Sequence, residues 1–575
     1  METTMPHDHD RNQQSTGDKS GQRMPTHLSR HSFLGRAAGV AAATATAGAL
    51  GRLPMGATIM NDRVLADTLP PGATPRADRA YTIRVSAARD ERARPLPDHP
   101  TNGDDARYAS THIGSYTKGL PHNTLGEVDP SAYAALLGAL QSGQPTDFEA
   151  IPLGGQAKLA GPQSAFAFLL EGADSGSLAT PPPPAFGSAE MAGEMAEMYW
   201  YALGRDVPFA RYTTDPRITQ AAADLSRLSA FRGPRAGGAV TSNTIFRLGL
   251  AGEISGPYVS QFQWLPVPYG TFSMDQRYPI APPAEFMTTY DAWLAVQNGI
   301  ITPPPPSKGP VIPAPSRYIV TGRDLAMYLI GDFPYQGYLN AMLILASMGA
   351  PWDKGNPYTK SKTQVGIATF GTAFHGLDLV AKVSNAALKA VHYQKWLVHR
   401  RVRPEEFGGR VHNQMTKAAH YPIHTDLLTT STVLDAIFQK HGTYLLPMPV
   451  PRGCPMHPSY AAAHSAITGA CITVLKAWFD ESYVLPAPVV ASDGGRSLLP
   501  YTGAPLTVGS ELDKLAGNHC VGRSFGGFHP RSDIIAGLLL GEAVAISMLA
   551  DERGTYNETF QGFSLTKFDG TTITV

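Results

Sequence analysis

Helical periodicity is the feature of this 575-residue chain that most restricts its fold. Apolar residues recur every three or four positions in many segments, as in residues 465–479 and 531–549. This spacing places them on one face of an α-helix, which must then pack against a neighbour. Strand-like alternation is nearly absent until KFDGTTITV at the C-terminus, where Asp569-Gly570 is a hairpin signal. We therefore expect a mainly α protein of bundled helices with a small C-terminal β-hairpin.

Proline-rich runs separate the predicted helices. PPPP at 181–184 and at 303–306, with Pro313 and Pro315, indicates long loops, because proline lacks a backbone N–H and holds φ fixed. The predicted helices cover residues 130–140, 164–170, 188–203, 284–296, 322–330, 335–348, 372–399, 424–440, 465–479, 512–520 and 531–549.

The beginning of the chain differs in composition from the rest. Residues 1–36 are polar with scattered Lys and Arg, and residues 37–50, AAGVAAATATAGAL, are small and apolar. This is the order of an export signal. SRHSFLGR looks like a twin-arginine motif with His31 in place of the second arginine. We expect residues 1–66 to be an export signal and leader, and the mature protein to be periplasmic or extracellular.

Two further sections follow the leader. Residues 67–125 are rich in Pro, Arg, Asp and Gly and are predicted to form an irregular N-terminal arm. Residues 126–575 are predicted to form one α-helical domain. No later apolar run is expected to span a membrane, since Glu542 interrupts LLLGEAVAISMLA.

Charge and cysteine content exclude several classes of protein. Lys plus Arg equals Asp plus Glu at 47 each, so no overall field favours nucleic acid or an anionic membrane. An anion site must therefore be a local cluster of cations. Cys454, Cys471 and Cys520 are too few and too irregularly spaced for a disulfide framework or a zinc site, and we expect small buried hydrophobes.

Basic residues first cluster in QKWLVHRRVRP. Lys395 and Arg403 lie near the C-terminal end of a predicted helix. Pro404 disfavours helical geometry at Arg403, so both cations can turn toward one pocket. The alternative is a solvated basic helix end, which the helix dipole also favours.

Two histidines precede an apolar helix in MHPSYAAAHSAITGACITVLKAWF. His457 is followed by Pro458, and His464 lies within about one turn of the helix start. A helix start presents unpaired N–H groups and a partial positive charge, which suit an oxyanion. The alternative is a histidine that only the local backbone satisfies.

The third cluster is GRSFGGFHPRSD, which contains Arg523, His529 and Asp533. Its Gly-Gly pair interrupts one helix, and Pro530 suits the first position of the next, which places His529 at a helix entrance. Asp533 lies four residues beyond His529 and can accept its second ring proton. Local capping would explain Asp533 alone, but not a second histidine at a helix entrance.

The ordered set Lys395-x7-Arg403-Pro404, then His464 and then Arg523-x5-His529-x3-Asp533 resembles the vanadium-dependent haloperoxidases, in the superfamily shared with type 2 phosphatidic acid phosphatases and bacterial acid phosphatases. The resemblance implies two four-helix bundles, long Pro- and Gly-rich loops and active-site motifs within 395–533. It runs from about residue 100 to the C-terminus. Further stretches that look like the algal bromoperoxidase branch are HPSY, LLPMP, GACITVLKAWFD, EMYWYALGRDVPF, GPYVSQF and KFDGTTITV.

A vanadate cofactor is what the resemblance implies first. His529 would bond vanadium, and Lys395, Arg403 and Arg523 would hold the oxygens together with the backbone N–H of Ala463. Three cations and a helix dipole are suited to offset the charge of this oxyanion. The sequence leaves calcium binding open.

The resemblance also implies catalytic roles for three residues. His464 would transfer protons, His457 matches a second histidine linked to halide reactivity, and Asp533 would support His529. Asp332 is our candidate for the carboxylate behind His464. Gln394 lies where halide preference is expected to be tuned.

One position departs from the family pattern. The helix entrance reads Ala462-Ala463-His464 in place of Ser-Gly-His. The missing hydroxyl normally contacts the oxyanion, while Ala463 still offers its N–H if its φ is negative. Loss of one charge-assisted hydrogen bond costs about 1.5–3 kcal/mol, so we expect vanadate affinity to fall by about one to two decades.

The activity that the resemblance implies is oxidation of bromide, or iodide, by hydrogen peroxide to hypohalous species that halogenate small organic acceptors. The branch forms homo-oligomers, so we expect one here. Two alternatives stay open: an acid phosphatase that uses the same pocket, with His529 as nucleophile, and a relative of low activity because of the alanine pair. The sequence leaves chloride competence and the organic acceptor open.

Overall fold

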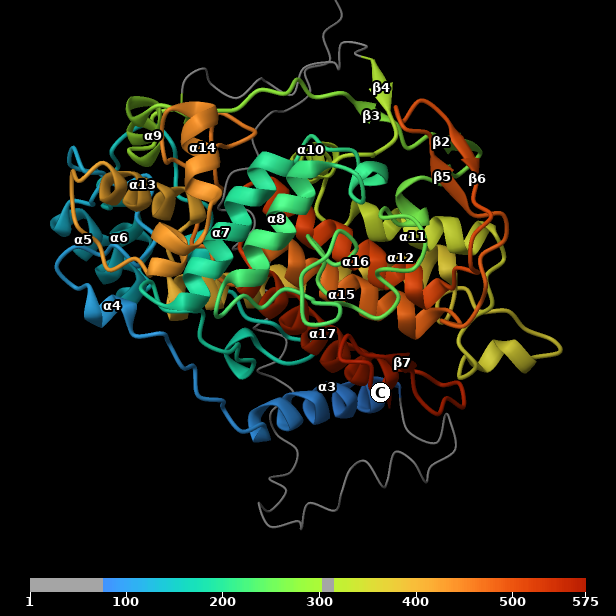
Figure 1. The fold of residues 1–575 in the computed structure, drawn as a ribbon. Helices are drawn as coiled ribbons and strands as arrows, with labels where there is room; N and C mark the ends of the chain where they lie inside the picture. Colours follow the sequence, from blue (N-terminus) through green and yellow to red (C-terminus); the bar gives the residue numbers. More distant parts are fainter. Residues whose placement is uncertain (1–75, 302–314) are drawn as a thin grey trace, which may run out of the picture. The chain divides into compact units, whose positions relative to one another are not determined.

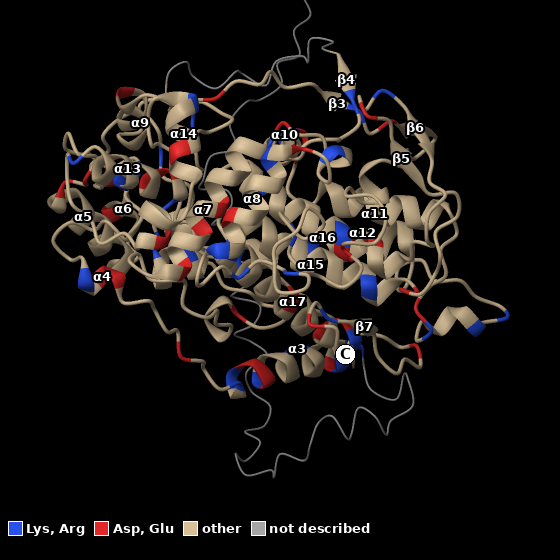
Figure 2. Ribbon diagram, viewed as in Figure 1, with Lys and Arg blue, Asp and Glu red and all other residues tan. Residues whose placement is uncertain are grey.

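The computed structural model describes residues 76–301 and 315–575, which belong to one compact unit, Leu69–Val575. The expected export signal and leader, residues 1–66, lie outside the described residues, as do the second PPPP run and Pro313. The fold is mainly α, as predicted (Figure 1). Lys and Arg are interspersed with Asp and Glu over the ribbon, consistent with the balanced charge (Figure 2).

A buried central helix organises the largest core. This helix, α15, packs against α12, α16 and α17, and α16 also contacts α10. These elements lie close together near the middle of the ribbon in Figure 1. Their bounds are α10 Gly322–Gly331, α12 Leu377–Tyr393, α15 Ala463–Trp478, α16 Val508–Phe525 and α17 Arg531–Arg553.

Glycines let α15 and α17 approach at backbone distance. A Cβ atom at Gly541 would lie 1.8 Å from the carbonyl oxygen of Ala466, and one at Gly469 would lie 2.0 Å from that of Leu538. No other residue fits these positions without moving one of the helices. The crossing sets the entrances of both helices side by side, where the N–H of Ala462 donates to the carbonyl of Asp533 at 2.8 Å.

A second core lies around α7, whose aromatic residues pack against Phe246 and Phe525. The remaining helices are α3 Arg76–Ala93, α4 Asp104–Arg107, α5 Pro130–Ser142, α6 Pro145–Glu149, α7 Ala189–Gly204, α8 Pro216–Arg227, α9 Tyr290–Gln297, α11 Gln336–Ser347, α13 Pro404–Met415 and α14 Val433–His441.

Two predicted helices are interrupted. The segment 372–399 consists of the π-helix Thr372–Gly376, then α12 and then a second π-helix, η7 (Gln394–His399). The segment 424–440 breaks at Ser431, because Ser431 and Thr432 donate their hydroxyls to the buried carboxylate of Asp224.

The predicted irregular arm needs correction. Residues 76–93, within 67–125, form the helix α3, none of whose residues is buried. Its sequence, RADRAYTIRVSAARDERA, has no apolar stripe for periodicity to reveal. The prediction for 164–170 is also wrong in kind, since a 3₁₀-helix covers Pro162–Phe166. Helices α8 and α13 were not predicted.

The C-terminal hairpin is confirmed. β7 pairs antiparallel with β8, with Leu565 opposite Ile573. Three other two-stranded ribbons were not predicted. The strands are β1 Val267–Tyr269, β2 Phe272–Met274, β3 Tyr278–Pro279, β4 Ser316–Arg317, β5 Val489–Ala491, β6 Leu498–Pro500, β7 Ser564–Thr566 and β8 Thr572–Thr574.

Two composition-based predictions can be checked. The three cysteines are free and buried, as expected. No later run was expected to span a membrane, yet α17 is long and apolar enough to do so by length and composition alone. However, 67% of its apolar window is buried inside the protein, as in a core helix. Glu542, which interrupts the run, accepts the N–H of Phe568 at 2.8 Å.

Candidate active site

Lys395 is fully buried in η7, directly after α12. Its ammonium donates to the carbonyls of Pro458 at 2.8 Å and Ser459 at 2.7 Å. Burial, and next the charge of Arg403, lower the pKa of Lys395 well below its ordinary value. Carbonyl oxygens are its only hydrogen-bond acceptors within the described ranges, so its charge is not neutralised.

Arg403 caps the start of α13 and joins two loops. Its backbone N–H donates to Glu406 at 2.9 Å. Its fully buried guanidinium donates to the carbonyls of His457 at 2.8 Å and Phe528 at 2.9 Å. It also contacts the rings of His529, with Nη1 3.1 Å from Nε2, and of His457, with Nη2 2.9 Å from Nδ1. Arg403 therefore lies between the second and third sequence clusters.

His529 is held in one tautomer. Its Nδ1 lies 2.9 Å from Asp533, a carboxylate that also accepts from Arg401 at 2.5 Å and from the Ser459 hydroxyl. Because Arg403 can only donate, Nε2 of His529 must be the unprotonated nitrogen and Nδ1 must carry the proton. Burial, and next the nearby cations, lower the pKa of His529 well below its ordinary value. The ring therefore offers a lone pair at Nε2.

Arg523 reaches the same cluster from α16. One guanidinium nitrogen donates to the carbonyl of Leu329 at 2.7 Å, while Nε is buried without a hydrogen-bond partner. The guanidinium lies 4.4 Å from the ring centre of Phe528. Burial lowers the pKa of Arg523 to about 9, although Asp332 opposes this shift.

His464 is the second residue of α15. Its Nε2 lies 3.5 Å from the carboxylate of Asp332, which follows α10, and has no hydrogen-bond partner. Burial and then the Arg523 charge lower the pKa of His464, and Asp332 opposes them. The side chain is 21% exposed, whereas Lys395 and Arg403 are fully buried, so His464 is on the accessible side of the cluster.

The entrance of α15 has no side-chain cap. Ala462 is the N-cap residue, and its methyl side chain supplies no hydrogen bond to the helix start. Ala463 is already helical and is not among the residues with positive φ. Its N–H can therefore donate to an oxyanion, which is the condition set in the sequence analysis. The hydroxyl of Ser465 is also buried without a partner.

The structure thus brings the predicted residues of all three sequence clusters together. None of Lys395, Arg403 and Arg523 forms an ion pair with a carboxylate within the parts of the chain that the structure describes. Buried charges without partners cost several kcal/mol. No group of three or more His, Cys, Asp and Glu that could hold a metal cation occurs among the described residues. The cluster is suited to an anion.

Sequence reasoning missed several supporting residues. Arg401 donates to Asp533 and, at 2.9 Å, to the buried Glu194. The ring of His392 lies 5.6 Å from that of His457. The HRRVRP run indicates that a cation is present but not which arginine enters the site. Whether Arg400, Arg401 or Arg403 points toward His529 depends on where the helix ends after η7. The amide of Gln394 binds the loop at Leu178 and Thr180.

Known proteins share this sequence and fold. A vanadium-dependent bromoperoxidase of Corallina pilulifera is 33% identical, over 87% of this chain and 98% of its own length. That of Ascophyllum nodosum is 32% identical, over 86% and 91%. The chain belongs to the vanadium-dependent bromoperoxidase family. Residues 382–557 also match the model of the VCPO second helical-bundle domain.

A solved structure agrees with this family assignment. The homohexameric structure of the second vanadate-dependent bromoperoxidase from Ascophyllum nodosum matches with a TM-score of 0.81 at 29% identity. The match covers 92% of this chain and 95% of that one. The predicted family and the predicted helical-bundle fold are confirmed.

Proposed function

We propose that this protein is a vanadate-dependent haloperoxidase that uses hydrogen peroxide to oxidise bromide to a species that brominates small organic acceptors. The observation that carries this proposal is the buried group of Lys395, Arg403 and Arg523 around the unprotonated Nε2 of His529, with no carboxylate paired to these cations among the described residues. The bromoperoxidases that match along nearly their whole length support the choice of halide.

Vanadate fits the residues present. Nε2 of His529 would bond the metal, and the three cations with the N–H of Ala463 would hold the oxygens. The unpartnered Nε of Arg523 supplies a donor that a bound oxyanion would satisfy. When bound, pentavalent vanadium supplies a Lewis acid that activates peroxide for attack by halide.

His464 is placed to move protons. Its lowered pKa keeps the ring neutral near neutral pH, so it can accept a proton from peroxide arriving at the cluster. Asp332, 3.5 Å away, stabilises the imidazolium that forms. Arg403 holds His457 at the edge of the cluster, and the ring of His392 lies beside it. We assign the role in halide reactivity to His457.

We also propose that the protein assembles into a homo-oligomer and is exported. The homohexameric relative supports a homo-oligomer. The basic and then apolar order of the first 66 residues supports export to the periplasm or the medium.

Parallel assays test the activity. The purified chain is loaded with vanadate and assayed for peroxide-dependent bromination of a cyclic 1,3-diketone and for hydrolysis of p-nitrophenyl phosphate. We expect bromination that depends on vanadate and bromide. Hydrolysis without bromination would replace the proposal by the phosphatase alternative, and neither activity would favour the low-activity alternative.

A further inference from the structure

A second site lies in a cavity of about 370 Å³, whose lining includes no residue of the His529 cluster. Its walls come from the loop after α7, the segment 242–264 and the end of β5. The volume is that of a small-molecule site. The lining residues that carry the inference are Phe209, Tyr212, Arg247, Tyr258 and Trp264.

Arg247 places a buried guanidinium in the wall of this cavity. The residue is only 6% exposed, and Nη1 donates to the carbonyls of Glu253 at 2.7 Å and Tyr258 at 3.3 Å. Its Nε is buried without a hydrogen-bond partner, and no ion pair involves Arg247 in residues 76–301 and 315–575. The nearby carboxylate of Glu253 is occupied by the backbone N–H groups of residues 248–250. A buried guanidinium of this kind attracts an anion.

The ring of Tyr258 lies against that charge and stacks on Phe209. The rings of Phe209 and Tyr258 stack at 3.9 Å with an interplanar angle of 5°. The Arg247 guanidinium lies 3.9 Å from the ring centre of Tyr258. Arg247 and Phe209 thus cover the two faces of Tyr258, so a flat aromatic ligand would meet the edges of these stacked rings, an arrangement that aromatic pairs favour. The one carboxylate of the lining, Asp493, is exposed, so water screens its charge.

The support of the site is rigid. The carbonyl of Arg247 accepts from Arg531 at 2.7 Å, and Arg531 forms a buried ion pair with Glu197 of α7. The guanidinium is therefore positioned before any ligand arrives, which lowers the entropic cost of binding.

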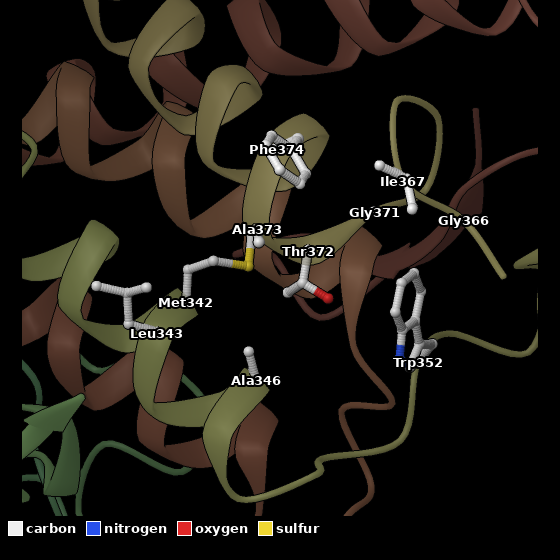
Figure 3. Close-up of a pocket in the computed structure, with 10 residues that line it drawn as sticks. All are labelled: Met342, Leu343, Ala346, Trp352, Gly366, Ile367, Gly371, Thr372, Ala373 and Phe374. Carbon is white, nitrogen blue, oxygen red and sulfur yellow. The ribbon is translucent and has the colours of Figure 1, made fainter. Parts of the chain in front are cut away.

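The cavity in Figure 3 differs from the cavity at Arg247 in the chemistry of its lining. Its volume is similar, about 330 Å³, and Met342, Trp352 and Phe374 are among its lining residues. Its lining contains no charged side chain. This second cavity therefore has no charged group that would bind an anion in preference to a neutral ligand.

We propose that the cavity at Arg247 binds a small aromatic carboxylate, with the carboxylate on the guanidinium and the ring against the edges of the stacked Phe209 and Tyr258 rings. The site is separate from the His529 cluster and does not depend on the function proposed for that cluster.

Calorimetric titration of the vanadate-loaded full chain tests the site. The probes are indole-3-acetate and the neutral indole-3-acetamide, which has the same ring. We expect saturable binding of the acid, about ten- to hundredfold tighter than the amide, because one charge-assisted contact is lost. Equal binding of both, or no binding of the acid at millimolar concentration, would overturn the proposal.

Two pairs of variants locate the binding. Thr213 lines the cavity and is exposed, so Thr213→Trp should fill it and abolish binding, while the matched Thr214→Trp, outside the lining, should bind as wild type. Arg247→Lys should retain more affinity than Arg247→Met. Binding by Thr213→Trp equal to that of Thr214→Trp, or acid binding only when vanadate is absent, would contradict the assignment.

Discussion

At the scale of single residues, one nitrogen decides the chemistry of the site. Nε2 of His529 is unprotonated because Arg403 can only donate to it, while Nδ1 keeps its proton and donates it in a hydrogen bond to Asp533. The sequence was sufficient to predict the His529–Asp533 pair, since a four-residue spacing at a helix entrance restricts both side chains. It could not predict Arg401 as the second partner of Asp533, because that contact joins distant segments.

Asp533 should therefore control the affinity for vanadate. Asp533→Asn keeps the size of the side chain but removes the charge that orients His529 and pairs with Arg401. We expect vanadate affinity to fall by about ten- to hundredfold, measured by equilibrium titration. The control is Asp569→Asn in the exposed hairpin, and equal affinities in the two variants would rule out this role.

The alanine pair at the α15 entrance gives a prediction in the opposite direction. Ala462→Ser with Ala463→Gly restores the hydroxyl that the N-cap lacks. Vanadate affinity should rise by about one to two decades, since one charge-assisted hydrogen bond contributes about 1.5–3 kcal/mol. The single Ala463→Gly variant separates the hydroxyl from backbone effects. An unchanged affinity in the double variant would show that the departure has no effect on the anion.

At the scale of elements, the approach of α15 to α17 positions the site. Periodicity predicted both helices but not their contact, because Gly469 and Gly541 have no side-chain pattern that reveals a partner. The breaks within 372–399 and 424–440 also could not be predicted from the sequence. The break at Ser431 depends on tertiary hydrogen bonds to Asp224, which override local propensity.

Gly541→Ala should destabilise the protein. The new methyl would lie 1.8 Å from the carbonyl oxygen of Ala466, so the helices must separate. We expect the free energy of unfolding to fall by at least about 1–3 kcal/mol, measured by denaturant titration. The matched control is Gly138→Ala in α5, where nothing lies within 4 Å of the added atom. That variant should gain about 0.5–1 kcal/mol, and a loss in both would refute the close-approach explanation.

At the scale of the whole molecule, buried neutral histidines should make the fold acid-sensitive. Burial lowers the pKa of His122 and His399 to about 3, and of His392 and His519 to about 4. The unfolded chain, with pKa near 6.5, binds more protons than the folded chain between about pH 4 and 6.5. Stability is therefore present above pH 6.5 and decreases on acidification.

The slope of this decrease can be measured. Each buried histidine contributes up to about 1.4 kcal/mol per pH unit to the free energy of unfolding. His399→Gln should reduce the slope by about one such increment in denaturant titrations between about pH 6.5 and 4. The exposed His420 provides the control, and an identical slope in His399→Gln would contradict the assignment.

The overall composition of the chain did not predict where the site lies. The equal numbers of acidic and basic residues pointed to no site. Only the folded chain shows that cations from η7, the N-cap of α13 and α16 meet around His529, without carboxylate partners in the described residues. The family resemblance carried that prediction, because motif order preserves information on contacts that spacing alone does not contain.

Stoichiometric titration with vanadate tests the central claim most directly. The wild-type chain should bind one vanadate per chain, and Arg403→Met should bind it at least about a hundredfold more weakly, because the cost of removing one member of a buried charged group is about 3–5 kcal/mol. Binding of vanadate that is unchanged in Arg403→Met, or absent in the wild type, would contradict a single anion site built from these residues.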